Sequence, residues 1–171
     1  MIVYASYGGT EDSKSVFGYV LKVNGDPVEF RTRKQKIVTL SSTEAEFVGI
    51  VEAMKSALFV DSIIKFCERS EEEIVITLKN DNQSAIQMLS NQRNGHCRTR
   101  HIHTRYHFLR FYIEEGKLEV KYERSSELLA DVLTKPLGRN AFEKHMKKLM
   151  NHETVTCRKE SEAGECVVKG L

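Results

Sequence analysis

Apolar residues change their spacing near residue 41, and this change restricts the chain to folds that join hairpin-linked strands to helices. Before it, residues 2–7, 16–23 and 28–33 have the apolar character of strands, and the sequence NGDP at residues 24–27 is typical of a tight turn. From residue 41 to residue 67, apolar side chains recur at helical spacing. The N-terminal part is therefore predicted to be an antiparallel meander followed by a long helix.

The remaining pattern alternates between the two kinds of element. It predicts a short extended segment at 37–40, strands at 74–79 and 117–124, and helices at 82–90, 126–135 and 139–150. A further helix before the last strand is predicted to carry Ile102, Tyr106, Leu109 and Ile113 on one face. The last helix is expected to turn four apolar residues inward: Phe142, Met146, Leu149 and Met150. This order predicts an α/β fold with a mixed sheet flanked by helices. Residues 1–150 are expected to form one domain, and 151–171 a polar, disordered tail.

Composition narrows the class of protein further. The net charge is only +2, so the chain as a whole is not a polycation, and any electrostatic role depends on local clusters. No apolar run is long enough for a membrane span, and the first residues lack the features of a signal peptide. The four cysteines are widely and irregularly spaced. These features predict a reduced intracellular setting, cytoplasmic or nuclear, with no membrane partner.

Three acidic residues stand where elements begin or end. Glu46 lies in the first turn of the long helix, Asp81 at a strand-to-helix junction, and Asp131 among apolar neighbours in a short helix. Each has an ordinary explanation as a dipole partner, a helix cap or a surface acid. If they meet, however, their oxygens suit Mg²⁺, and two such ions can promote hydrolysis of a phosphodiester.

A long segment without acidic residues is the second sequence feature that bears on function. Between Asn82 and Ile113 there is no Asp or Glu, and the basic residues in this window include Arg98, Arg100, His101 and Arg105. Such a run is often only a solvated face. Its length here favours contact with phosphates of a nucleic acid, for which the arginine fork is well suited.

The sequences LSSTEAEF, NDNQSAI, CRTRHIHTRYHFLR and LLADVLTKPL, in this order, resemble the ribonuclease H domain of copia-type retrotransposon Pol polyproteins over residues 2–150. The resemblance implies a ribonuclease H-like fold with a five-stranded mixed sheet whose first three strands are antiparallel. It also implies Mg²⁺-dependent cleavage of the RNA strand of an RNA–DNA hybrid, alongside a reverse transcriptase. Glu46, Asp81 and Asp131 match three of the four metal-binding acids, and Asn82, Gln83 and Ser84 are expected to contact the nucleic acid.

The chain departs from the family pattern at two positions. Tyr4 stands where the fourth acid belongs, and a phenol is a poor ligand for Mg²⁺ at neutral pH. His103 stands where the family has an aspartate. These departures predict a truncated or degenerate copy that binds hybrid or other nucleic acid, with weakened or lost Mg²⁺ binding and crippled cleavage. Two alternatives remain: an active ribonuclease H, and a non-catalytic protein-interaction module or inert fossil.

Overall fold

The computed structural model describes residues 1–9, 14–36, 38–39, 41–69, 73–90 and 100–151. Over residues 3–9 and 100–102 this description covers the backbone alone. Two predictions fall outside the described residues: the tail from residue 152 onward, and the position of Arg98.

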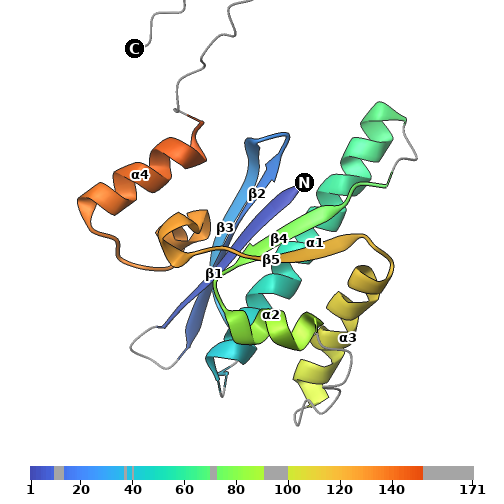
Figure 1. The fold of residues 1–171 in the computed structure, drawn as a ribbon, viewed down its shortest axis with the longest axis horizontal. Helices are drawn as coiled ribbons and strands as arrows, with labels where there is room; N and C mark the ends of the chain where they lie inside the picture. The colour runs from blue at the N-terminus through green and yellow to red at the C-terminus, as the bar shows by residue number, and fades with distance from the viewer. Residues whose placement is uncertain (10–13, 37, 40, 70–72, 91–99, 152–171) are drawn as a thin grey trace, which may run out of the picture.

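Five strands form one mixed sheet in the order β3-β2-β1-β4-β5 (Figure 1). The antiparallel meander predicted from the sequence consists of β1 (Ile2–Gly9), β2 (Ser15–Val23) and β3 (Asp26–Lys34). Its tight turn is made by Asn24 and Gly25, which both have positive φ angles, as two-residue hairpin turns require. The strands β4 (Ile76–Asn80) and β5 (Leu118–Tyr122) extend the sheet in parallel beyond β1.

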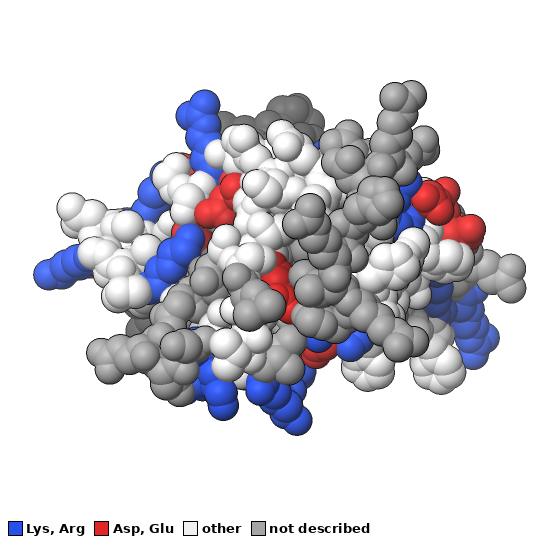
Figure 2. Space-filling view, turned by 90° about the horizontal axis from the view of Figure 1, so that it is seen from below, with Lys and Arg blue, Asp and Glu red and all other residues white. Residues whose placement is uncertain are grey.

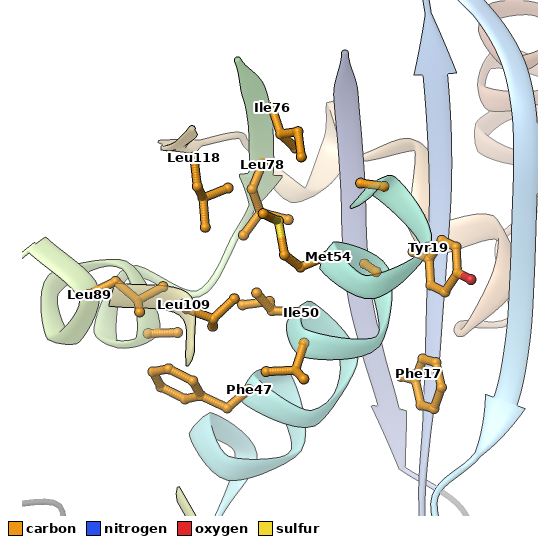
Figure 3. Packing of buried hydrophobic residues seen from close by; sticks show 14 of the residues in the cluster. Phe17, Tyr19, Phe47, Ile50, Met54, Ile76, Leu78, Leu89, Leu109 and Leu118 are labelled. Carbon is orange, nitrogen blue, oxygen red and sulfur yellow. The ribbon is translucent and has the colours of Figure 1, made fainter. Parts of the chain in front are cut away.

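The long helix α1 (Ser42–Glu68) covers one face of this sheet. Ser41 caps it, because its hydroxyl accepts a hydrogen bond from the backbone N–H of Glu44. The small residues Gly49, Ala53 and Ala57 are buried along the helix, which lets it lie close to β1 and β2. Figure 3 shows the larger side chains of α1 packing among strand residues and the helices α2 (Gln83–Ser90) and α3 (Arg100–Glu114).

The opposite face of the sheet carries the C-terminal segment. Phe17 and Tyr19 of β2 belong to the core with α1, so Gly18 between them faces the other way. A Cβ atom at Gly18 would lie 2.8 Å from side-chain atoms of both Leu133 and Thr134. The short 3₁₀ helix η2 (Leu129–Leu133) therefore packs directly on the backbone of β2, and α4 (Arg139–Leu149) packs on η2.

Two local predictions are wrong. The helix predicted at 126–135 is instead two 3₁₀ turns, η1 (Ser125–Glu127) and η2. On α4, Phe142 and Met150 are exposed, whereas Leu149 is buried as predicted and His145 is buried as well. Of the extended segment predicted at 37–40, residues 38 and 39 belong to no strand, and residues 37 and 40 lie outside the described residues. No helix in the described part of the chain is both long and apolar enough to span a membrane.

Candidate active site

Glu46 reaches the end of the sheet from the first turns of α1. It is buried, and its carboxylate accepts a 3.0 Å hydrogen bond from the side-chain amide of Asn80, the last residue of β4. Ile76, Leu78 and Asn80 alternate as buried residues along β4, so Asn80 faces the helix side of the sheet by the period of the strand. The same alternation brings Glu46 and the end of β4 together.

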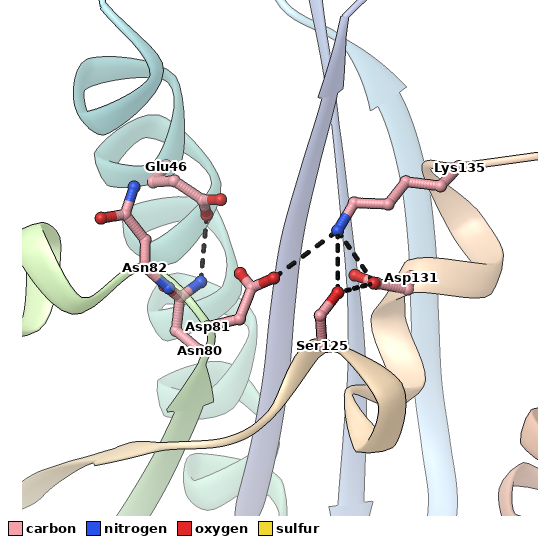
Figure 4. Close-up of polar contacts among 7 residues, drawn as sticks. All are labelled: Glu46, Asn80, Asp81, Asn82, Ser125, Asp131 and Lys135. Atoms are coloured by element: carbon pink, nitrogen blue, oxygen red, sulfur yellow. Dashed lines mark hydrogen bonds and ion pairs between the residues drawn. The ribbon is translucent and has the colours of Figure 1, made fainter.

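Asp81 follows Asn80 directly and turns toward the other face. Its carboxylate lies 3.6 Å from the ammonium group of Lys135, just beyond η2. The alternation at the end of β4 thus divides the site: Asn80 contacts Glu46 of α1, and Asp81 approaches the segment packed on the opposite face (Figure 4).

Asp131 is buried in η2, within the segment packed on the opposite face of the sheet, and its side chain is only 3% exposed. One of its oxygens accepts hydrogen bonds from the hydroxyl of Ser125 at 2.7 Å and from the ammonium group of Lys135 at 2.8 Å. Lys135 is four residues after Asp131, and the ammonium group points between Asp131 and Asp81 (Figure 4). The two aspartates therefore converge on one positive charge that the chain itself supplies.

The electrostatics of the site follow from burial. Loss of solvation on burial raises the pKa of Glu46 from 4.5 to about 7; the hydrogen bond from Asn80 opposes this rise, and the negative charge of Asp81 adds to it. Burial alone would lower the pKa of Lys135, but the hydrogen bond and charge of Asp131, with Asp81, raise it overall. Lys135 is thus held in its charged form, whereas Glu46 shares a proton with solvent near neutral pH.

The carboxylate oxygens of the cluster are ligands of the kind that Mg²⁺ prefers. Lys135, however, already forms ion pairs with two of the three acids, and the third accepts a hydrogen bond from Asn80. Among the side chains that the structure describes, no group of three or more His, Cys, Asp or Glu residues could hold a metal ion. The arrangement as it stands does not fit a pair of magnesium ions.

The backbone register gives the position of Tyr4. In β1 it pairs with Val20 of β2 on one side and with Lys79 of β4 on the other, two residues before Asp81. Tyr4 is therefore in the central strand, next to the strand that ends at the acidic cluster. Its role as the degenerate fourth position stays a prediction.

The polar residues after Asp81 have different surroundings. Asn82 is the cap of α2, because its side-chain oxygen accepts a hydrogen bond from the backbone N–H of Ala85. The helix cap is therefore Asn82, and Asp81 remains available for the contact with Lys135. Gln83 and Ser84 are exposed in the first turn of α2. Their contact with nucleic acid, like that of Asn82, stays a prediction.

A second polar feature is a cavity of about 270 Å³ beside the N-terminal half of α1. Its lining includes four basic residues, Arg33, Lys34, Lys36 and Arg105, together with Gln35 and the acid Glu52. Glu52 pairs with Lys55, and one guanidinium nitrogen of Arg105 is buried without a hydrogen-bond partner among the described residues. Arg105 thus joins residues at the end of β3 in a basic cavity.

Two further residues of the predicted binding segment, Arg100 and His101, are placed only by their backbone, in the first turn of α3. Figure 2 views the molecule from the side on which α2 and the start of α3 lie. Acidic side chains are visible within this face, and lysine and arginine side chains project around its margin.

Sequence reasoning missed three residues of the site: Asn80, Ser125 and Lys135. The i, i+4 spacing of Asp131 and Lys135 was a usable signal, since such residues lie on one face of a helical segment. The buried alternation ending at Asn80 was another. Nothing local marks Ser125, because its contact with Asp131 depends on how η1 turns back toward η2.

Comparison with known proteins shows which proteins have a similar sequence. It is 34% identical over 136 residues to the retrovirus-related Pol polyprotein from transposon TNT 1-94 of Nicotiana tabacum, covering 80% of this chain. It is 32% identical over 148 residues to the Pol polyprotein from transposon RE2 of Arabidopsis thaliana, covering 83% of this chain. In both cases the chain spans only 10% of the relative. No protein-family model matches it.

Solved structures give the fold. The structure of LC11-RNase H1 in complex with an RNA/DNA hybrid superposes with a TM-score of 0.58, at 11% identity, over 85% of this chain and 98% of that one. At this identity the likeness concerns the fold alone. The chain therefore belongs among the homologues of the retrotransposon Pol polyproteins and has the ribonuclease H-like fold.

Proposed function

We propose that this chain is the ribonuclease H-like domain of a copia-type retrotransposon Pol, that it binds an RNA–DNA hybrid or other nucleic acid, and that its ancestral Mg²⁺-dependent cleavage of the RNA strand is crippled. It would act inside the cell, in cytoplasm or nucleus, where its ancestral partner in reverse transcription is a reverse transcriptase. The proposal follows from the acidic cluster and from the basic residues around it.

The observation that carries the loss of cleavage is the missing fourth acid. In the remaining cluster the ammonium group of Lys135 lies 2.8 Å from Asp131 and 3.6 Å from Asp81, so the two aspartates already share a cation. A fourth acid would add the negative charge needed to draw divalent ions into this cluster. The sequence has Tyr4 there instead, one strand away from Asp81. The resident ammonium group cancels one of the three negative charges that would otherwise attract Mg²⁺.

Nucleic-acid binding is supported separately. The cavity beside α1 combines four basic side chains with one acid that is already paired. One guanidinium nitrogen of Arg105 has no hydrogen-bond partner within the described part of the chain, and arginine can hold a phosphate oxygen through its fork. Recognition of a hybrid through 2′-hydroxyls and groove shape would show little base preference.

The decisive experiment is cleavage of an end-labelled RNA–DNA hybrid in Mg²⁺ by the wild-type chain, Tyr4→Asp and Tyr4→Asn. The wild type should stay near background. Tyr4→Asp should raise the rate by about 100-fold or more, since even a 1 Å misplacement of reacting groups can cost that much. Tyr4→Asn is the matched control, because it removes the ring without adding a carboxylate.

Three outcomes contradict parts of the proposal. A wild-type rate equal to that of Tyr4→Asp, and abolished by Asp81→Asn, would mean that the chain is an active ribonuclease H. Equal background rates in all three chains would mean that Tyr4 is not the cause of inactivity. Hybrid affinity that is weak and insensitive to salt would exclude phosphate contacts and leave a protein-interaction module or an inert remnant.

A further inference from the structure

Two histidines on the exposed side of α3 form a pair that the acidic cluster and the basic cavity do not use. His103 and His107 are four residues apart, so one helical turn places them on the same face. Both are exposed. Their Nε2 atoms lie 3.0 Å apart, and the rings meet edge to face with centroids 4.2 Å apart.

In the structure one ring donates a hydrogen bond to the other, and the same 3.0 Å separation of the nitrogens suits two ligands of one metal ion. Imidazole binds divalent transition metals at about 2.0–2.1 Å. With the nitrogens 3.0 Å apart, an ion bonded to both would have an N–metal–N angle of roughly 90–95° at that bond length. This angle is near the right angle of tetragonal and octahedral coordination and well below that of a tetrahedron. The geometry thus favours Cu²⁺ and Ni²⁺ over Zn²⁺.

The core holds the pair in position. The ring of His107 packs edge to face against Tyr106, with centroids 5.4 Å apart, and Tyr106 is only 6% exposed. One ligand is therefore oriented by a residue that is itself fixed in the core, so chelation costs less side-chain freedom than it would for two mobile histidines. The open side of α3 leaves room for water to complete the coordination of the ion.

We propose that His103 and His107 form a two-imidazole chelate for a divalent transition metal, with Cu²⁺ preferred, followed by Ni²⁺ and Zn²⁺. The order follows from the angle at the metal and from the general rise of affinity toward copper in the first-row series. Mg²⁺, which takes oxygen ligands, is not bound there. This site is separate from the acidic cluster and does not depend on nucleic-acid binding.

The test uses the full chain without an affinity tag, because a polyhistidine tag would add competing ligands. Binding of Cu²⁺, Ni²⁺, Zn²⁺ and Mg²⁺ is measured by calorimetry for the wild type, His103→Gln and His107→Gln. Loss of an outer-shell partner alone typically weakens metal binding by about 10–100-fold, so loss of either ligand should weaken Cu²⁺ binding at least tenfold. His152→Gln is the control, since it removes one histidine from the sequence and keeps both His103 and His107.

A spectroscopic measurement then counts the nitrogen ligands of the bound Cu²⁺ ion. The paramagnetic resonance spectrum of the Cu²⁺ complex should show two coupled nitrogens in the wild type and in His152→Gln, and one in either pair variant. Circular dichroism should show that all four chains keep their helix content. Unchanged Cu²⁺ affinity in both pair variants, equal loss in His152→Gln, or no saturable Cu²⁺ binding by the folded wild type would each overturn the proposal.

Discussion

Lys135 decides the charge balance of the acidic cluster. Its ammonium group contacts Asp131, which is 3% exposed, and Asp81, which is 21% exposed. Besides the ammonium group of Lys135, Asp131 has the hydrogen bond from the hydroxyl of Ser125. A buried carboxylate that loses its charged partner is costly, so the stability of the domain depends on this one side chain.

Lys135→Met should lower the free energy of unfolding by about 1.5–3 kcal/mol, the usual contribution of a hydrogen bond to a charged group. Urea denaturation at neutral pH measures it. Lys55→Met is the matched control, because Lys55 pairs with Glu52 on the surface of α1, where such pairs contribute about 0–1 kcal/mol. Equal losses in the two variants would contradict a structural role for the cluster.

The same variant tests whether Lys135 stands in for a metal. Once the ammonium group is gone, Asp81 and Asp131 can offer their oxygens to Mg²⁺, and a ligand that binds only the folded state stabilises it. Millimolar Mg²⁺ should therefore raise the melting temperature of Lys135→Met more than that of the wild type. The idea fails if both chains respond alike.

Glu46 should make stability depend on pH. The unfolded chain titrates this group near 4.5 and the folded chain near 7, so between these values the folded state binds more protons and its stability falls as the pH rises. The loss should be complete above pH 7, with an upper limit of about 3 kcal/mol. Glu46→Gln, which cannot titrate, should flatten the decline between pH 5 and pH 8 in urea denaturation. A slope unchanged by the substitution would place its cause elsewhere.

For individual residues, the sequence predicted the acidic side chains of the cluster better than the side chains that contact them. Glu46, Asp81 and Asp131 lie around one cluster with Asn80 and Lys135, as their positions at element ends suggested. The role of Lys135 could not be predicted from spacing alone, because a long lysine side chain can equally well extend into water. Which way it points is decided by the close packing of η2 on the sheet.

Among the secondary-structure elements, the contact between η2 and β2 positions half of the site. Gly18 permits this contact, since a Cβ atom there would come within 2.8 Å of Leu133 and Thr134. The approach of η2 to the strand brings Asp131 to the side of the sheet that Asp81 faces. The two elements are far apart in sequence, so a local change at Gly18 should affect the distant acid.

Gly18→Ala should destabilise the domain by about 1–3 kcal/mol, the typical cost of overpacking a tight contact. Gly138→Ala is the matched control, because a Cβ atom at Gly138 meets nothing within 4 Å. Thermal unfolding of the two variants beside the wild type gives the comparison. A Gly18→Ala domain as stable as the control would show that η2 can move away from β2 without cost.

Elements with strong periodicity were predicted well, and short ones were not. The helix from residue 42 has a serine cap and apolar residues on a consistent face, so both its start and its buried side follow from the sequence. Over the five residues of η2, helical and 3₁₀ spacing cannot be told apart, and Pro136 prevents a longer helix. On α4, Leu149 is buried as predicted, whereas Phe142 and Met150 are exposed, and the helix packs on η2.

For the molecule as a whole, the basic cavity predicts how nucleic-acid binding responds to salt. The affinity for a hybrid should fall steeply as salt rises, and Arg105→Gln should reduce the slope of log Kd against log salt by about 1. Arg139→Gln is the matched control, because Arg139 is exposed on α4, away from α3 (Figure 1). Fluorescence anisotropy with a labelled hybrid gives the slopes; equal slopes for Arg105→Gln and the wild type would remove Arg105 from the interface.

The division of the acidic cluster between the two faces of the sheet also fixes the order in which it can be assembled. Glu46 and Asp81 leave the ribosome first, while Asp131 and Lys135 emerge only after the last strand has been made. Until then Asp81 lacks the ammonium group that it meets in the complete domain. Closing the cluster is thus a late event of biosynthesis, and a chain that stops before residue 135 would leave that charge uncompensated.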